Sequence, residues 1–474
     1  MIDVSVLVTA AAAYDVDAAR LALRRHGVRR GLLAMRAARH EQANDHVLAA
    51  ADTELLPVAT LNPVQYLDWP AELERVGAAG AVALRFFPDA QGWSVHSEAF
   101  QVMRRRIAVP LLLPVGTFGD ATAIGAATHG HGAVVLVGAH YTQLGDCLAA
   151  LERWPHLYLE TSRLAHFRAV ETVVRSVGAD RLLFGSGAPT RPIQAALNMV
   201  FAARIGVSDK RAILAGNAAR LFDVREEHFE LPAPTVAQNP IDVHGHIGAL
   251  GLPTPSICPS EQVAVAAQYG IVTTIASSLR AIANDAEAGN VETLAAACPE
   301  LRAYVVVDPN DLSSACRAMD AAYAGDRAVG AKLHCSYARS PTASRATVAL
   351  LHEVARRGRP LLIHVDGPDW DTALAEVARA HPRWKVILAH GGPGTTVRAA
   401  AEIVERTDNV FVELSTSFPD LPLIREVVQR VGHGRLLFGS DAPLLDAAYA
   451  LGVYADAGAD LAATTPTARE IFDW

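Results

Sequence analysis

Short apolar runs rich in Val, Ile and Leu alternate with longer stretches rich in Ala and Arg along the whole chain. The apolar runs predict buried strands, and the longer stretches, such as 261–269, 343–357 and 399–406, predict helices. This alternation indicates parallel β-α-β units, because each helix returns the chain to the start of the next strand. The first half contains expected strands at 2–8, 31–36, 56–61, 80–87, 109–115, 132–139, 157–162 and 182–187. The second half contains them at 241–247, 271–278, 302–308, 328–335, 360–366, 385–391, 410–416 and 436–442.

The two halves of the chain repeat one another. The segment RLLFGSGAP at 181–189 matches RLLFGSDAP at 435–443 at every position except one. Shorter matches join 2–5 to 241–244, 109–114 to 359–364, and 157–160 to 410–413. A repeat of this length is far longer than a solenoid unit, so each copy is expected to form its own domain.

Eight β-α units in each copy predict the (β/α)8 barrel. The alternative is a doubly wound open sheet, but no G-x-G-x-x-G turn follows the first strand of either copy. We therefore predict an α/β protein with two tandem (β/α)8 TIM-like barrels, at 1–224 and 241–474. Residues 225–240 contain three prolines and are expected to form an extended linker between the barrels.

Composition narrows the class of protein. A chain of 474 residues that is 51% hydrophobic can bury large cores, and its net charge of −8 is mild. No basic block suggests nucleic acid, and no apolar run is long enough to span a bilayer. The N-terminus enters a strand-like run directly, without the features of a secretory signal. The five cysteines form no C-x-x-C pair and are odd in number, so we expect a cytoplasmic protein without disulfides.

Histidines gather where the strands of the second copy end. His244 and His246 share one face of the first strand, because strand side chains alternate with a period of two. Further polar side chains stand at the ends of the fourth, fifth, sixth and eighth strands: Lys332 and His334, His364, His390, and Asp441. The carboxyl ends of barrel strands meet at one face, where function gathers. Imidazoles with a carboxylate suit zinc or a similar divalent ion, so we predict one metal site there.

These motifs resemble those of the amidohydrolase superfamily, and within it the amidohydrolase-2 family, which includes hydrolases and related decarboxylases. The resemblance covers the second copy and rests on D-V-H-G-H, G-A-K-L-H, L-I-H, L-A-H-G-G and F-G-S-D-A-P. It implies that one divalent metal ion, most readily Zn²⁺, is held by His244, His246, His364 and Asp441. It also implies that His390 hydrogen-bonds the attacking water or a substrate oxygen. A binuclear site bridged by a carboxylated Lys332 is the alternative.

The expected chemistry follows from the ion. A bound metal lowers the pKa of its water from about 15.7 to near 7. Asp441 can then accept a proton from that water and pass it to the leaving group, while His390 or Lys332 stabilises the developing oxyanion. The candidate substrate contacts are His334, Arg280, Arg339 and Trp370. His334 could equally support the site from behind, and each arginine could equally lie in a solvated loop.

The first copy lacks the ligand set. Ser5, Leu7, Pro114 and Gly187 stand opposite His244, His246, His364 and Asp441. Only His140 falls near the place of His390, shifted by a few residues. We therefore expect a degenerate, non-catalytic barrel that pairs with the catalytic barrel within the chain, because enzymes of the resembled family are often homodimers. A further homodimer of the whole chain is an alternative, and a separate ligand site near Arg85 and His140 is another.

The leading hypothesis is a metal-dependent hydrolase of a small polar amide, ester or lactone, acting in the second barrel. The first alternative is a metal-dependent nonoxidative decarboxylase of a small carboxylic acid. The second alternative is a non-catalytic metal-binding or regulatory protein. The loops that choose the substrate carry no recognisable pattern, so the sequence does not name the substrate.

Overall fold

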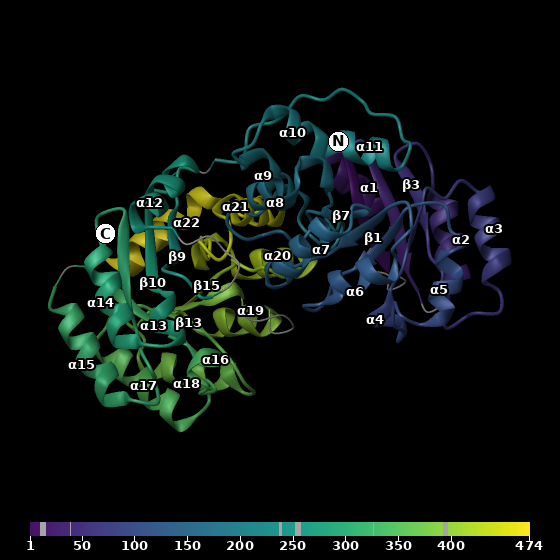
Figure 1. The fold of residues 1–474 in the computed structure, drawn as a ribbon. Helices are drawn as coiled ribbons and strands as arrows, with labels where there is room; N and C mark the ends of the chain where they lie inside the picture. Colours follow the sequence, from purple (N-terminus) through teal and green to yellow (C-terminus); the bar gives the residue numbers. More distant parts are fainter. Residues whose placement is uncertain (10–15, 38, 237–238, 252–256, 326, 392–396) are drawn as a thin grey trace. The chain divides into compact units, whose positions relative to one another are not determined.

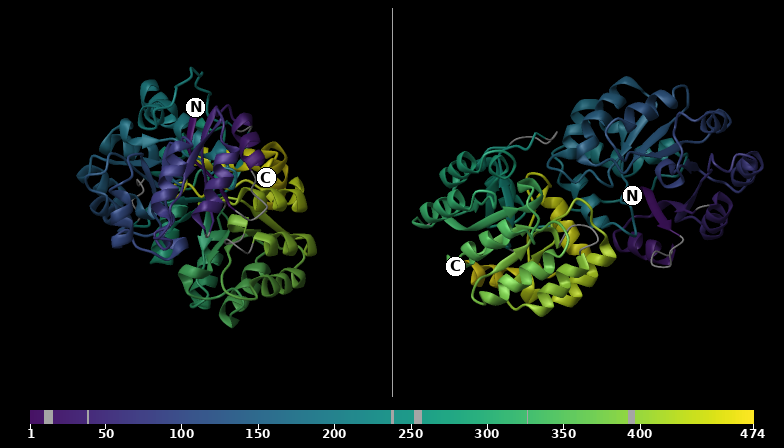
Figure 2. Two further views of the ribbon diagram at one scale, coloured as in Figure 1. Left: turned by 90° about the vertical axis from the view of Figure 1, so that its right-hand side faces the viewer. Right: turned by 90° about the horizontal axis from the view of Figure 1, so that it is seen from below.

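The chain forms two compact units, Met1–Pro234 and Thr235–Trp474, in the computed structural model. The structure describes residues 1–9, 16–37, 39–236, 239–251, 257–325, 327–391 and 397–474. Residues 237–238 of the expected linker and Gly392 of the L-A-H-G-G motif lie outside these ranges. Each unit contains one eight-stranded parallel sheet whose strands follow one another in sequence order (Figure 1). Figure 2 shows the strands and helices of each unit from two further sides.

In the first unit the strands are β1 (Ile2–Thr9), β2 (Arg30–Arg36), β3 (Leu55–Ala59), β4 (Ala83–Arg85), β5 (Leu111–Pro114), β6 (Val134–Val137), β7 (Leu157–Glu160) and β8 (Leu182–Leu183). Its α-helices are α1 (Val16–Arg25), α2 (His40–Ala50), α3 (Trp69–Ala78), α4 (Pro88–Gln91), α5 (Glu98–Arg104), α6 (Asp120–Ala127), α7 (Leu144–Arg153), α8 (Ala169–Val177), α9 (Ile193–Ala202), α10 (Val207–Arg211) and α11 (Asn217–Leu221).

In the second unit the strands are β9 (Ile241–Ile247), β10 (Thr273–Ser278), β11 (Leu301–Val306), β12 (Ala328–His334), β13 (Leu361–His364), β14 (Val386–Leu388), β15 (Val410–Glu413) and β16 (Leu436–Leu437). Its α-helices are α12 (Pro259–Gln268), α13 (Leu279–Ala283), α14 (Ala286–Ala296), α15 (Leu312–Tyr323), α16 (Cys335–Ala338), α17 (Arg345–Arg356), α18 (Trp370–Ala380), α19 (Val397–Arg406), α20 (Leu421–Val431), α21 (Ala447–Ala457) and α22 (Leu461–Phe472).

Both sheets close on themselves. In the first unit Val4 N–H donates to the carbonyl of Phe184 over 2.9 Å, which ties β1 to the segment after β8. In the second unit Val243 N–H donates to the carbonyl of Phe438 over 2.9 Å, and Gly245 forms a parallel bridge with Ala442. The prediction of two tandem (β/α)8 barrels is therefore confirmed.

The last strand of each barrel is shorter than predicted. The apolar pattern predicted strands at 182–187 and 436–442, but the regular ladder ends at Leu183 and Leu437. The backbone then turns through positive φ, at 75° for Gly187 and 60° for Asp441. Left-handed backbone cannot continue a strand ladder, so an apolar run does not by itself mark where the strand ends.

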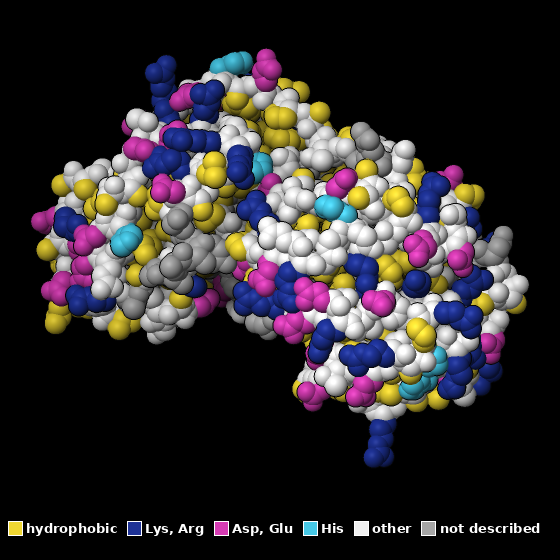
Figure 3. Space-filling view, turned by 180° about the vertical axis from the view of Figure 1, so that it is seen from behind, with side chains coloured by type: hydrophobic (Ala, Val, Ile, Leu, Met, Phe, Trp, Pro, Cys, Tyr) yellow, Lys and Arg dark blue, Asp and Glu magenta, His cyan; other side chains and the backbone are white. Residues whose placement is uncertain are grey.

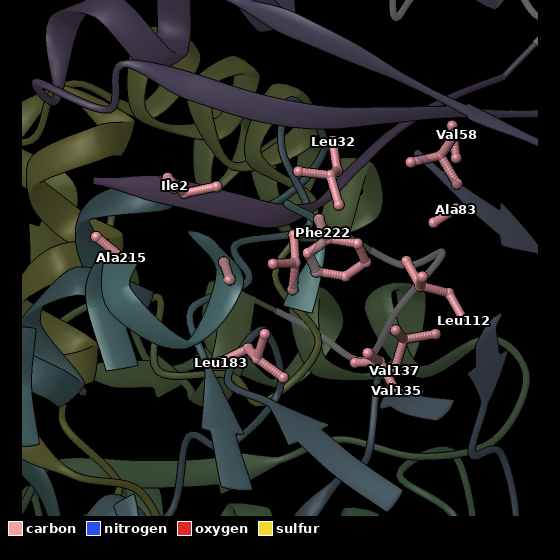
Figure 4. Packing of buried hydrophobic residues seen from close by; sticks show 13 residues of the cluster. Ile2, Leu32, Val58, Ala83, Leu112, Val135, Val137, Leu183, Ala215 and Phe222 are labelled. Carbon is pink, nitrogen blue, oxygen red and sulfur yellow. The ribbon is translucent and has the colours of Figure 1, made fainter. Parts of the chain in front are cut away.

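Apolar side chains from the strands fill the barrel interiors. Figure 4 shows buried side chains of the first barrel, including Ile2, Leu32, Leu112, Val135 and Leu183, beside the ring of Phe222. The second barrel has an equivalent cluster that runs from Ile241 and Val243 to Phe472 of the last helix. These cores fill the barrel interior next to the carboxyl ends of the strands. Their close packing limits the movement of the polar side chains at those strand ends.

Helix capping matches the sequence. The side chains of Asp311, Ser344 and Asp420 each accept a hydrogen bond from a backbone N–H in the first turn of α15, α17 and α20. Basic and acidic side chains are interspersed over the face drawn in Figure 3, as expected for a mildly charged chain. Within the described residues, every helix is too short or too polar to cross a bilayer.

Candidate metal centre

The two histidines of β9 lie beside Asp441 at the closing seam of the second barrel. His244 and His246 are 1% and 3% exposed. Asp441 N–H donates to the carbonyl of His244 over 2.7 Å, which fixes the loop after β16 against β9. Residues from the two ends of the barrel domain therefore form one site, because closure of the sheet makes the first and last strands neighbours.

The imidazole nitrogens of these two histidines point at the same carboxylate oxygen. Nε2 of His246 lies 2.9 Å from Oδ1 of Asp441, and Nε2 of His244 lies 3.6 Å from it. Ligands at about 2.0–2.1 Å in a tetrahedral zinc site stand about 3.3 Å from one another. The ligand atoms of His244, His246 and Asp441 all lie within 4.8 Å of one another. Their spacing therefore suits a single small divalent ion.

The opposite ring nitrogens are held from behind. Nδ1–H of His244 donates to Oε1 of Glu413 over 2.8 Å, and Nδ1 of His246 lies 3.0 Å from the hydroxyl of Ser277. A carboxylate or hydroxyl partner at one ring nitrogen fixes the tautomer and directs the other nitrogen's lone pair forward. Glu413 and Ser277 therefore orient the two imidazoles toward Asp441.

Three further histidines extend the cluster. The rings of His364 and His334 stack at 3.9 Å with an interplanar angle of 10°, and His390 lies 4.9 Å from both His364 and His244. Nδ1–H of His390 donates to the carbonyl of Ser415 over 2.5 Å. His364 lies among these rings, but the described metal-ligating groups do not include it. Its Nδ1 is buried and has no hydrogen-bond partner among the described residues.

Lys332 is fully buried at the same point. Its Nζ donates a hydrogen bond to Nε2 of His244 over 3.1 Å. Burial lowers the pKa of Lys332 to about 8, against the attraction of Asp441 and Glu413. An ion bound at this nitrogen of His244 would replace the hydrogen bond from Lys332, because the single lone pair serves one partner at a time.

Burial favours the neutral form of two of the histidines, His244 and His364. Burial, followed by the charge of Lys332, lowers the pKa of His244 well below its usual value. Burial and the neighbouring His390 lower the pKa of His364 in the same direction. Burial alone would raise the pKa of Asp441, but the hydrogen bond from His246 and the nearby positive charges lower it. Neutral imidazoles and an ionised carboxylate are the forms that bind a metal ion.

Three predicted substrate contacts lie outside this cluster of rings. Nη1 and Nη2 of Arg280 donate to Glu292 and Asp285, at 2.7 and 3.3 Å, on the exposed surface of α13 and α14. Arg339 is exposed and ends α16 with a positive φ of 52°. Trp370 is 4% exposed and begins α18. A substrate role for these three residues stays a prediction.

Glu413 has a larger part in the site than the sequence suggested. Because Glu160 stands at the same position in the first copy, the sequence predicted only that this glutamate supports the barrel. Both copies have that support. Glu160 accepts hydrogen bonds from the N–H groups of Gly138 and Ser162, both at 2.6 Å. Glu413 accepts the same pair from His390 and Ser415, and in addition contacts His244. Only the spatial contact with His244 reveals this second role.

These matched hydrogen bonds define the residue of the first barrel that is equivalent to His390. The structural counterpart of His390 is Gly138, since the N–H of each donates to the equivalent glutamate and both have positive φ. His140 lies two residues further along, where its side chain caps the short helix at Tyr141–Gln143. The offset of two residues between His140 and the true counterpart of His390 agrees with the expected shift of a few residues.

Comparison with known proteins establishes the family. A family model described as amidohydrolase matches residues 126–224 and 241–472, and the chain belongs to this amidohydrolase family. The match extends into both barrels, which agrees with a tandem duplication. None of the curated proteins matches the chain.

Several solved structures are similar to about half of the chain. A 2,6-dihydroxybenzoate decarboxylase from Rhizobium is 16% identical over 50% of this chain and 99% of its own, with a TM-score of 0.39. A putative 2-pyrone-4,6-dicarboxylic acid hydrolase from Pseudomonas putida is 18% identical over 50% and 98%, with a TM-score of 0.39. A dihydroxybenzoic acid decarboxylase from Polaromonas, with bound manganese and an inhibitor, is 15% identical over 50% and 97%, with a TM-score of 0.39.

Proposed function

We propose that the second barrel is a metal-dependent hydrolase of a small polar amide, ester or lactone. The convergence of the His244 and His246 Nε2 atoms on one oxygen of Asp441 carries this proposal. Membership of the amidohydrolase family supports an enzyme of this general kind. Hydrolysis needs a base beside the attacking water. Asp441 faces the Nε2 atoms of both histidines, whereas Glu413 accepts hydrogen bonds from two backbone N–H groups and from His244.

The donor set fits a divalent ion. His244, His246, His364 and Asp441 would hold it, and the buried, unpartnered Nδ1 of His364 is consistent with a missing bonding partner. Three imidazoles and a carboxylate suit Zn²⁺, and we propose zinc as the resident ion. When bound, such an ion lowers the pKa of water to near 7 and polarises a substrate carbonyl.

The side chains around the ion have separate tasks. Asp441 accepts a proton from the attacking water and delivers it to the leaving group. His390 is fixed by the Ser415 carbonyl at Nδ1, so its other ring nitrogen faces the cluster and can contact a substrate oxygen. Lys332 can donate a hydrogen bond to an oxygen that gains negative charge in the transition state. His334, stacked on His364, forms one wall of the site.

We further propose that the first barrel is non-catalytic. Its positions equivalent to His244, His246, His364 and Asp441 hold Ser5, Leu7, Pro114 and Gly187, and none of these side chains is a strong metal ligand. The working site is then confined to the second barrel.

A paired assay tests the proposed reaction. The purified full chain is analysed for metal and then incubated with panels of lactones, esters and amides and, separately, with hydroxybenzoic acids. We expect about one zinc per chain and acid release from the first panel, lost on chelation and restored by zinc. Carbon dioxide release from the second panel, without hydrolysis of the first, would identify a decarboxylase instead. A metal content of zero in protein never exposed to chelator would contradict both enzyme assignments.

A further inference from the structure

The strand-end face of the first barrel carries arginines where the second barrel carries its metal site. Arg85 of β4 pairs with Leu112 of β5, as Lys332 of β12 pairs with Leu362 of β13. Arg85 is therefore the structural counterpart of Lys332, and a permanent positive charge replaces a titratable one.

Arg85 points toward the place that corresponds to the metal site. Its Nη1 donates to the hydroxyl of Ser5 over 3.4 Å, and Ser5 occupies the position of His244. The side chain is 8% exposed, and its Nε has no hydrogen-bond partner among the described residues. Burial lowers the pKa of Arg85 to about 10, against the attraction of Glu160 and Asp3, so the guanidinium stays charged at neutral pH.

A second arginine covers the position of the lost carboxylate. A Cβ atom built on Gly187 would lie 2.5 Å from Cδ of Arg191, so the stem of Arg191 fills the space that the Asp441 side chain has in the other copy. The Nη1 atom of Arg191 is buried and also has no hydrogen-bond partner within the described chain. The aliphatic stem of an arginine thus takes the place that the Asp441 side chain has in the second barrel.

The nearby carboxylates are already committed to the backbone. Asp3 accepts hydrogen bonds from the N–H groups of Ser5 and Ser186 and from the Ser186 hydroxyl. Glu160 accepts from the N–H groups of Gly138 and Ser162 and from the Ser162 hydroxyl.

In the part of the chain that the structure describes, neither carboxylate forms an ion pair with Arg85 or Arg191 within 4.0 Å.

Further positively charged side chains lie at the edge of this strand-end face. Burial, and then the charges of Arg163 and Arg191, lower the pKa of His140 to about 3, which places both guanidinium groups near this imidazole. A buried guanidinium with free N–H groups is costly unless an anion accepts its hydrogen bonds.

We propose that the strand-end face of the first barrel binds a small anion through carboxylate or phosphate oxygens, held by Arg85 and Arg191. The planar N–H forks of arginine match both kinds of oxygen group. Duplication would then have converted a cation site into an anion site by exchanging the signs of the side chains on one scaffold. This proposal is independent of the reaction assigned to the second barrel.

Calorimetric titration of the full chain tests the proposal. Inorganic phosphate and malonate are titrated separately at constant ionic strength, with sodium chloride as the reference. We expect one saturable site for at least one of the two anions. Arg191→Leu, which installs the residue type of Leu445 at the equivalent position, should weaken binding about tenfold or more. Arg85→Met should weaken it at least as much.

Matched variants distinguish this site from anion binding elsewhere on the chain. Arg105→Leu removes an exposed arginine of the same barrel and should leave the affinity within about twofold of the parent. Circular dichroism confirms that each variant is folded, and Arg191→Leu carries the test if Arg85→Met does not fold. Phosphate binding or malonate binding alone supports the site and identifies the oxygen group.

Two outcomes would overturn the proposal. The first is a heat of titration equal to that of sodium chloride, or an unchanged affinity in folded Arg191→Leu. The second is binding that persists in Arg191→Leu but disappears in Asp441→Asn, since this result would assign the anion to the second barrel.

Discussion

In the first barrel the buried carboxylate of Asp3 accepts hydrogen bonds from the N–H groups of Ser5 and Ser186, at 2.9 and 3.0 Å. In the second barrel Asp242 accepts the equivalent bonds from His244 and Ser440, at 3.1 and 2.9 Å. These bonds hold the first strand to the loop after the last one in both copies. The closing seam is thus a property of the scaffold, retained whether or not a metal-ligand set is present.

The two barrels differ in the residue that follows this seam, which is Asp441 in the second barrel and Gly187 in the first. Asp441 has a φ of 60° and Gly187 a φ of 75°, so both copies require left-handed backbone at the same point. Glycine adopts this conformation freely, whereas a residue with a Cβ is disfavoured by about 1–2 kcal/mol. The second barrel keeps the disfavoured residue, which is understandable if the carboxylate is needed there. The scaffold therefore accommodates a side chain at this left-handed position, which the proposed role of Asp441 needs.

The largest expected effect is a loss of turnover when Asp441 of the second barrel is replaced, because the first barrel has no equivalent carboxylate. Asp441→Asn keeps the volume of the side chain but removes the proposed base and an anionic ligand. We expect kcat to fall by about 10²–10⁴-fold, measured on the substrate found by the paired assay, with an unchanged circular dichroism spectrum. Asp408→Asn, on an exposed loop, is the control and should retain full activity. Near-normal turnover in Asp441→Asn would contradict the proposal that Asp441 is the base and that only the second barrel is catalytic.

The next effect concerns acid stability of the first barrel. His166 is fully buried with no hydrogen-bond partner at either ring nitrogen among the described residues, and burial lowers its pKa to about 4. The unfolded chain therefore binds more protons than the folded chain between about pH 6.5 and pH 4, and stability falls as pH falls through this range.

A shift of this size corresponds to about 3 kcal/mol of unfolding free energy. His166→Phe should remove that loss, as measured by urea unfolding at several pH values. His96→Phe, an exposed substitution in the same barrel, should keep the parent curve. An unaltered pH profile in His166→Phe would show that other groups govern acid unfolding.

A smaller effect tests the shared glutamates against each other. Glu413→Gln weakens the support of His244 Nδ1, so metal affinity should fall by about 10–100-fold in a competition titration with a chelator. Glu160→Gln alters the equivalent bonds of the first barrel and is the matched control. It should change the free energy of unfolding without altering metal affinity. Equal loss of affinity in both variants would mean that the glutamates act only through general stability.

The smallest effect concerns the left-handed position of the first barrel. Gly187→Ala places a Cβ at positive φ and against Arg191, so we expect the unfolding free energy to fall by about 1–2 kcal/mol with kcat unchanged. Gly132→Ala is the control, because a Cβ there meets no atom within 4 Å. Loss of turnover in folded Gly187→Ala would bring the first barrel into the reaction.

The architecture and the core of the candidate metal centre could be predicted from the amino-acid sequence. Strand alternation, the internal repeat and the histidines at strand ends predicted two barrels and a cluster that contains His244, His246 and Asp441. These features are local or periodic, because strand faces alternate every two residues and barrel strands end at a common face. Helix and strand positions could be predicted for the same reason.

Only the tertiary structure decided which partners orient the site. The contact of Glu413 with His244 and the hydrogen bond of Lys332 to the same ring join residues far apart in the chain. The match of Gly138 to His390 and the placement of Arg191 over Gly187 likewise depend on backbone conformation. No sequence period encodes the contacts of Glu413 and Lys332 with His244, because closure of the barrel, not spacing along the chain, brings these atoms together.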